Sequence, residues 1–401
     1  MKGNRAVCYV MALVLCLCCL AGCDEKEQPF ILGMDASAVP SLEAGGVQYY
    51  NRDGQVQDVF EILADAGINY IRVRVWNNPF DENGNGYGGG NCDIQNALTI
   101  GKRATQYEMK LLVDFHYSDF WADPGKQAAP LSWKNMPIEE KTEALYRFTC
   151  ESLDLLKKAG VDVGMVQIGN ETNGGIAGET QWENMARLFS AGAKAVRDTL
   201  PKALVALHFT NPEKPGAYAY YSQQLADYEV DYDVFASSYY PQWHGSLENL
   251  RAVLGAVNET YGKRVLVVET AHAYTVNDLD FHSNTVTVET KTPYPKTVEG
   301  QAAWVRDVAK AVSEIPGGMG LFYWEGTWIS AGGSSWEENR TLWETYGSGW
   351  ASSFAGQYDP KDAGKYYGGC AVENQAFFDS HGKALGSLGV FADIRQELET
   401  P

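Results

Sequence analysis

Basic residues are scarce in this sequence. Its 401 residues include 32 Lys and Arg against 51 Asp and Glu, and the formal net charge is −19 at pH 7. A chain this acidic repels nucleic-acid backbones and anionic lipid headgroups. The balance therefore excludes nucleic-acid binding and membrane attachment through basic patches, and a neutral ligand is the partner that fits it best.

Cysteine is also sparse outside the first 23 residues, which hold five of the eight. The other three are Cys92, Cys150 and Cys370, an odd number of residues far apart in the chain. Neither a disulfide framework nor a zinc site is supported by such spacing. We expect each of the three to be a small core or loop residue.

The N-terminus carries a short apolar run over residues 7–20, behind Lys2 and Arg5. It is too short for a transmembrane helix and is typical of a signal peptide, here residues 1–22. The run ends in Leu-Ala-Gly-Cys23, which resembles a bacterial lipobox. We expect Cys23 to be acylated and residues 23–30 to form a tether, with an ordinary cleavage site as the alternative.

No stretch rich in Pro, Gly or Ser interrupts the remaining chain, so residues 31–401 are predicted to form one domain. Short apolar runs alternate with amphipathic helical patterns, as in a parallel sheet. Such a series predicts an α/β fold, a (β/α)8 TIM barrel, with a doubly wound open sheet as the alternative. The predicted strands are 30–36, 68–76, 109–116, 163–171, 203–209, 232–240, 264–270 and 319–325.

Long loops are predicted after the third, seventh and eighth strands, at 117–137, 271–297 and 326–374. Barrel enzymes place their sites on this face. The loops contain more than half of the tryptophans, and exposed aromatic faces stack against sugar rings. We therefore expect the loop tryptophans as a group to contact a ligand. These tryptophans are Trp121, Trp133, Trp328, Trp336, Trp343 and Trp350.

Polar residues at alternate strand positions share one face of the sheet. Arg72 and Arg74 share a face of the second strand, and Asp114 and His116 share a face of the third. Both pairs are therefore predicted to point into the barrel near its mouth.

Two glutamates end apolar strands: Glu171 follows Asn170 at the fourth, and Glu269 ends the seventh. Burying a carboxylate costs several kcal/mol, so both should emerge at the barrel mouth. Paired carboxylates suit glycoside hydrolysis, in which one protonates the leaving oxygen and the other attacks or activates water. Ligand positioning or ion pairing with the arginines is the alternative. Glu325, beside Trp324, is a further carboxylate that we expect to bind sugar.

Seven stretches resemble the arabinogalactan endo-β-1,4-galactanases of glycoside hydrolase family 53, over about residues 31–392. The most specific is DFHYSDFWADPGKQ at 114–127. The others are GMDAS (33–37), RVRVWNNP (72–79), MVQIGNE (165–171), SYYPQWHG (238–245), VVETA (267–271) and GQAA (300–303).

This resemblance implies a retaining endo-hydrolase of β-1,4-galactan in type I arabinogalactan and pectic side chains, with Glu171 as acid/base and Glu269 as nucleophile. A mannanase or xylanase of the same clan, or a non-catalytic glycan-binding lipoprotein, is the rival. The segments after Glu171 and Trp324 depart from the family pattern and leave subsite details open. The implied substrate-binding residues are Asp35, Arg72, Arg74, His116, Asn170, Tyr240, Trp243 and Trp324.

The run at 278–284, DLDFHSN, spaces oxygen-bearing residues as a hard cation requires. Spacing alone favours a solvated acidic loop, but the resemblance implies a structural Ca²⁺ joining the loops after the seventh and eighth strands. The implied ligands are Asp278, Asp280, His282 and Asn284. We expect no organic cofactor, and a monomer.

The two catalytic candidates should titrate differently. A neighbouring anion disfavours ionisation of Glu171, whereas Arg72 or Arg74 favours the anion of Glu269. We expect the pKa of Glu171 to lie above that of a free carboxyl and the pKa of Glu269 to lie at or below it.

Acylation of Cys23 predicts an outer-membrane lipoprotein, and Asp24 and Glu25 resemble the start of surface-exported lipoproteins. An endo-acting enzyme is useful where large polymers are, so we expect exposure on the cell surface, with the periplasmic face as the alternative. Protease treatment of intact cells should degrade the domain. Survival until the outer membrane is breached would contradict surface exposure.

Overall fold

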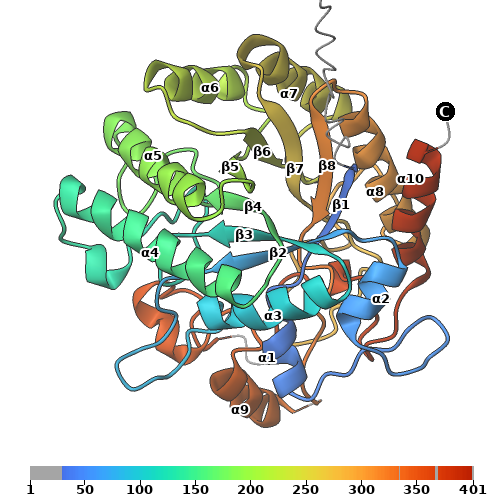
Figure 1. Cartoon of the computed structure of the whole chain (residues 1–401). Coiled ribbons are helices and arrows are strands. Elements are labelled where there is room, and N and C mark those ends of the chain that lie inside the picture. Colours follow the sequence, from blue (N-terminus) through green and yellow to red (C-terminus); the bar gives the residue numbers. More distant parts are fainter. Residues whose placement is uncertain (1–28, 334, 366–368, 400–401) are drawn as a thin grey trace, which may run out of the picture.

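Eight parallel strands close into a barrel in the computed structural model, which describes residues 29–333, 335–365 and 369–399 (Figure 1). Residues 1–22 and Cys23 lie outside the described residues. The barrel and its order confirm the predicted (β/α)8 fold and exclude the open sheet. The strands are β1 (Ile31–Asp35), β2 (Tyr70–Val75), β3 (Lys110–Phe115), β4 (Val163–Ile168), β5 (Leu204–Phe209), β6 (Val234–Ser238), β7 (Arg264–Thr270) and β8 (Gly318–Tyr323).

Helices surround the barrel (Figure 1), and several begin at a side chain that accepts a backbone N–H, as Asp93 and Thr297 do. The helices are α1 (Val39–Ala44), α2 (Val59–Asp65), α3 (Ile94–Gln106), α4 (Ile138–Lys158), α5 (Trp182–Thr199), α6 (Ala217–Asp227), α7 (Leu247–Tyr261), α8 (Val298–Ser313), α9 (Trp336–Tyr346) and α10 (Val390–Glu399). Short 3-10 turns are η1 (Leu131–Trp133), η2 (Ser353–Gln357), η3 (Glu373–Gln375) and η4 (Gly386–Gly389). No described helix has the length and apolar character needed to cross a membrane.

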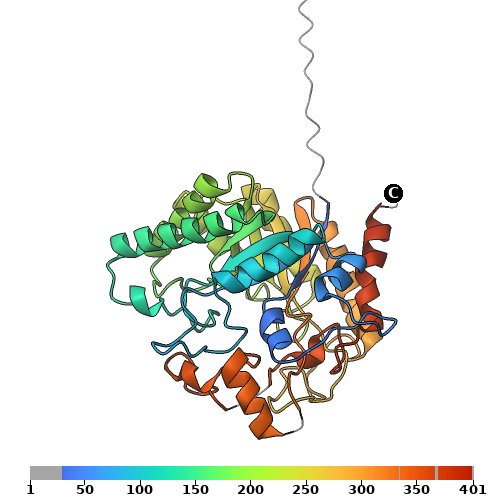
Figure 2. The ribbon, with the colours of Figure 1, turned by 60° about the horizontal axis from the view of Figure 1, so that its bottom comes forward.

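The long loops and α9 gather at one end of the barrel, opposite the end at which the described chain begins (Figure 2). This is the end where the strands finish, because the predicted loops after β3, β7 and β8 are all present there. Sequence patterns did not indicate α1, α9 or the long segment between β2 and α3. These additions enlarge the rim around the barrel mouth.

Three of the six loop tryptophans have a packing role, whereas Trp121 and Trp350 line a pocket, so the expectation that the group contacts a ligand holds only in part. Trp133, Trp328 and Trp343 are buried. Trp328 and Trp343 belong to an apolar cluster that also contains Trp76 from the segment after β2. The loops therefore have a hydrophobic core of their own, which holds the rim in place.

The inner face of the barrel is apolar below and polar above. Its lower part contains residues such as Leu112, Ala236 and Val268. Asp114 lies two residues after Leu112 in β3 and faces inward as well, as the alternation of strand residues predicts. Polar residues therefore point inward only near the mouth.

Glu269 reaches that mouth through an irregularity in β7. Val268 lies in the inner core, so simple alternation would turn Glu269 outward. The β6–β7 register shifts so that Ser237 pairs with Val267, whereas Ser238 pairs with Glu269. This bulge aligns the glutamate with the inward-facing Ser238.

Candidate active site

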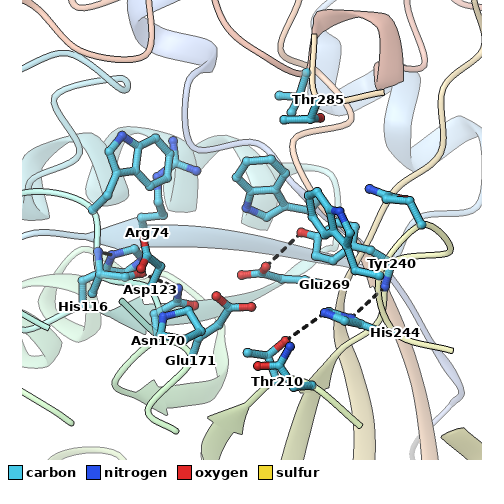
Figure 3. Close-up of a pocket in the computed structure, with 18 of the residues that line it drawn as sticks. Arg74, His116, Asp123, Asn170, Glu171, Thr210, Tyr240, His244, Glu269 and Thr285 are labelled. Carbon is cyan, nitrogen blue, oxygen red and sulfur yellow. Dashed lines mark hydrogen bonds between the residues drawn. The ribbon is translucent and has the colours of Figure 1, made fainter. Parts of the chain in front are cut away.

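A pocket opens at the mouth of the barrel, with Glu171 and Glu269 facing each other across it (Figure 3). Of the predicted substrate-binding residues, six line it: Arg74, His116, Asn170, Tyr240, Trp243 and Trp324. Asp35 and Arg72 do not line it, because they are buried beneath its floor. Their effect on a ligand is therefore exerted through other residues.

Glu269 is held by one cation and one phenol. An Arg72 nitrogen lies 2.8 Å from its Oε1. The Tyr240 hydroxyl donates to Oε2 at 3.0 Å (Figure 3). These two contacts fix both carboxylate oxygens and leave the group at the pocket surface. A carboxylate fixed in this way can act as a nucleophile toward a carbon bound above it.

Glu171 stands just beyond the end of β4 in a left-handed backbone conformation, with φ of 46°. Such a conformation is uncommon for a residue other than glycine and is found at functional sites. One carboxylate oxygen of Glu171 and one of Glu269 lie within 4.8 Å of each other. Retaining glycosidases hold their carboxyl groups about 5–5.5 Å apart, whereas inverting enzymes leave room for water.

Burial raises the pKa of Glu171 to about 8, and the neighbouring charge of Glu269 adds to this shift. The expectation for Glu171 is therefore confirmed. The expectation for Glu269 is wrong in direction, since burial raises its pKa as well, and the opposing effect of Arg72 only limits the rise. Burial of the whole pocket floor, which the sequence does not show, accounts for the difference.

Arg72 connects the pocket floor to β1, β3, β7 and the segment after β4. Besides Glu269, its guanidinium contacts Asp35 at 3.0 Å, Asp114 at 2.8 Å and the Asn170 side-chain oxygen at 2.9 Å. The Asn170 amide in turn donates to a backbone carbonyl of the loop after β3 at 2.8 Å. A single buried cation therefore orients the nucleophile candidate and the asparagine beside the acid candidate.

Arg74 supports the aromatic wall of the pocket. It forms a buried ion pair with Glu325, and its guanidinium carbon lies 4.3 Å from the Trp121 ring centroid. Trp121 stacks on Trp350 with centroids 4.5 Å apart, and both line the pocket. Glu325 does not line the pocket, so the expectation that it binds sugar is wrong.

Several lining residues were not predicted, and four of them follow strand ends as the predicted ones do. Thr210 and Asn211 follow β5, while Gln242 and His244 follow β6. Position after a strand would have identified these four. Other lining residues come from long loops, where sequence offers no such guide: Asp123, Thr285, Val372 and Gln375.

The loops after β7 and β8 meet at two carboxyl groups, the half-buried Asp280 and the buried Glu373. Oxygens of Asp280 and Glu373 and the Cys370 sulfur lie within 4.8 Å of one another. Burial raises the pKa of Asp280 to about 7 and that of Glu373 to about 8. Carboxyl groups facing each other in the interior are a pair that a cation stabilises.

The predicted cation ligands occupy this junction to different degrees. Asn284 is buried beside Glu373, and its Oδ1 has no hydrogen-bond partner among the described residues. Asp278 is exposed and accepts a long hydrogen bond from the Asp280 backbone. His282 donates its backbone N–H to Asp280 at 2.7 Å. Carboxylate and amide oxygens form a donor set that fits Ca²⁺; Glu373 was not predicted.

The family model that matches the chain is that of glycosyl hydrolase family 53, over residues 31–391. The chain is 58% identical to the endo-β-1,4-galactanase of Bacillus subtilis (strain 168), covering 92% of this chain and 86% of the relative. An arabinogalactan endo-β-1,4-galactanase of Cellvibrio japonicus (strain Ueda107) is 35% identical, with 81% and 86% covered. The solved catalytic domain from Ignisphaera aggregans has a TM-score of 0.81 at 36% identity, with 91% and 96% covered.

The coupling of the two carboxyl groups can be measured without substrate. Replacing Glu269 by Gln removes the adjacent charge, so the pKa of Glu171 should fall below about 8 yet stay above that of a free carboxyl. Carbon-13 NMR titration of labelled glutamate carboxyls reports it. Glu325 is the internal control, because Arg74 and Asp35 provide its nearest charges. An unchanged pKa of Glu171 in this variant would refute the coupling.

Proposed function

The chain belongs to glycosyl hydrolase family 53, and on this basis we propose that it cleaves internal β-1,4-galactosidic bonds of galactan with retention of configuration. The substrate is the galactan of type I arabinogalactan and of pectic side chains. The observation that carries the proposal is the Glu171–Glu269 pair, spaced as retention requires. Xylanase, mannanase and binding-only alternatives are not favoured beside the identity with galactanases.

In the first step Glu269 attacks the anomeric carbon and forms a glycosyl ester, while Glu171 gives its proton to the departing glycosidic oxygen. The raised pKa of Glu171 keeps that proton in place at neutral pH. Arg72 and Tyr240 hold the attacking carboxylate in position. The Asn170 amide lies where it can bind the hydroxyl next to the reacting carbon.

In the second step the ionised Glu171 takes a proton from water, which attacks the ester and releases the sugar with its original configuration. The Trp121–Trp350 stack, Trp324 and the exposed Trp243 offer faces for neighbouring galactose rings. Several aromatic faces around one pocket support an endo-acting hydrolase, which binds more than one sugar ring.

We also propose Ca²⁺ as a structural ion between the loops after β7 and β8, held by Asp280, Asn284 and Glu373 with Asp278 and His282 nearby. The ion would stabilise the buried carboxyl groups and supply no catalytic chemistry. Anchoring through acylated Cys23 and exposure on the outer surface are further proposals, supported by the sequence motif at 20–23.

Glutamine variants separate the roles of the catalytic pair. Glu269→Gln should abolish galactan hydrolysis yet retain oligosaccharide binding, because it removes the nucleophile and changes shape little. Glu171→Gln should lower galactan hydrolysis about 10²–10⁴-fold. On an aryl galactoside with an activated leaving group, the Glu171→Gln variant should regain activity when azide is added. The product should then be the β-galactosyl azide.

The control is Glu259→Gln. Glu259 belongs to a second Asn-Glu dipeptide, is exposed on α7, and its replacement should leave turnover unchanged. Reducing-sugar assays on galactan, mannan and xylan measure all three variants. Ordinary galactan activity in Glu171→Gln, or preference of the wild type for mannan or xylan, would refute the proposed function.

Calcium should raise the melting temperature, because an ion that binds only the folded state stabilises it by about 2.7 kcal/mol at 100 times Kd. Chelation should reverse this gain. Asp280→Asn should abolish it, while Glu289→Gln, an exposed change in the same loop, should not. Purified protein without metal, and with unchanged melting in chelator, would refute the site.

A further inference from the structure

The last residue of β6 places a buried hydroxyl between the two catalytic glutamates. Ser238 Oγ lies 2.6 Å from Glu171 Oε1, 2.8 Å from His208 Nε2 and 3.4 Å from Glu269 Oε2. A serine hydroxyl has one proton to donate and two lone pairs. It can therefore donate to only one of the two close neighbours, Glu171 or His208, at a time.

The mechanism makes opposite demands on the group beside Glu171. A protonated Glu171 must be stabilised before the first step, and an ionised Glu171 before the second. A fixed donor would favour only the ionised form, and a fixed acceptor only the protonated form. A hydroxyl that rotates serves both forms, provided that it has a second acceptor to turn to.

His208, the second-last residue of β5, is suited to be that acceptor. Burial lowers the pKa of His208 well below its ordinary value, and the charge of Arg72 adds to this effect, so the ring is neutral. A neutral imidazole carries one N–H and one lone pair. Which nitrogen holds the proton then decides whether Nε2 accepts from Ser238 or donates to it.

The surroundings of Nδ1 favour the proton on that nitrogen. Nδ1 lies 2.9 Å from the Asn170 side-chain oxygen, which can only accept. Two donors are farther away, the Glu171 backbone N–H at 3.3 Å and the Gln167 amide at 3.1 Å. The Gln167 amide has a closer acceptor in Asp114 at 2.6 Å. The shortest contact of Nδ1, to Asn170, therefore favours the tautomer in which Nδ1–H donates to Asn170 and Nε2 accepts.

We propose that Ser238 is a rotating positioning residue for the acid/base, with His208 as its alternative acceptor. While Glu171 is protonated, its O–H donates to Ser238, and Ser238 donates to His208 Nε2. Once Glu171 has transferred its proton to the glycosidic oxygen, the Ser238 O–H turns and donates to the carboxylate. No proton leaves Ser238 or His208 in either state; only the hydroxyl changes direction.

Other charged and titratable groups surround these residues and set the background against which the rotation acts. Facing Glu171 are Glu269 from β7, Asp123 from the loop after β3, Tyr240 from the loop after β6 and Tyr218 from α6; facing His208 are Arg72 from β2, His116 after β3 and His244 after β6. None of them bridges Glu171 and His208 as Ser238 does, and Thr210, whose side chain also hydrogen-bonds Glu171, pairs with His244 instead of His208. The proposed effect is therefore assigned to the hydroxyl.

The inference rests on the proposed role of Glu171, and the upper limit of the kcat/KM pH profile on galactan tests it. Ser238→Ala removes the donor to ionised Glu171, so this limit should move up by about one pH unit, the value of one charged hydrogen bond. Ser238→Thr keeps the hydroxyl, so it should restore the upper pH limit of the wild type. His208→Leu leaves Ser238 no acceptor except the carboxylates, so the limit should move down.

Opposite shifts in Ser238→Ala and His208→Leu support the rotation. An unchanged upper limit in Ser238→Ala, or an upward shift of this limit in His208→Leu, overturns it. In either case, galactan hydrolysis by the wild type would still support the proposed function. If His208→Leu does not fold, nitrogen-15 NMR of labelled wild-type protein decides: a proton on Nδ1 of His208 supports the proposal, and one on Nε2 overturns it.

Discussion

The buried guanidinium of Arg72 is the interaction on which the active site depends. It lies among Asp35, Asp114 and Glu269, which come from three different strands. An unpaired charge in this position would cost several kcal/mol, so each carboxylate needs the cation and the cation needs them. The strand ends and the nucleophile are therefore fixed by the same contact. Loss of Arg72 would disturb geometry and ionisation together.

The pair of glutamates works because its two members differ in their neighbours. Glu269 touches the cation, whereas Glu171 accepts hydrogen bonds from hydroxyl groups and lies near the Glu269 carboxylate. Within the same buried pocket, Arg72 favours the anion of Glu269, whereas burial and the charge of Glu269 keep Glu171 as an acid. Ser238 belongs to this asymmetry, because a hydroxyl imposes no charge of its own.

Sequence predicted the strands and the convergence of Glu171 and Glu269, since periodicity and strand ends depend on local pattern. It did not predict the bulge that turns Glu269 inward, because register shifts arise from pairing between strands. Nor did it separate Trp121, which lines the pocket, from Trp343, which is buried under the rim. Burial depends on contacts distant in the chain, and the direction of the Glu269 pKa was missed for the same reason.

The described chain enters β1 at the end of the barrel opposite the catalytic mouth (Figure 2). The point of attachment at residue 29 is therefore separated from the pocket by the full height of the barrel. A solid support or a fused carrier attached there would leave the opening facing a polymer in solution. Attachment through the N-terminus is for this reason the orientation of choice for immobilising the enzyme.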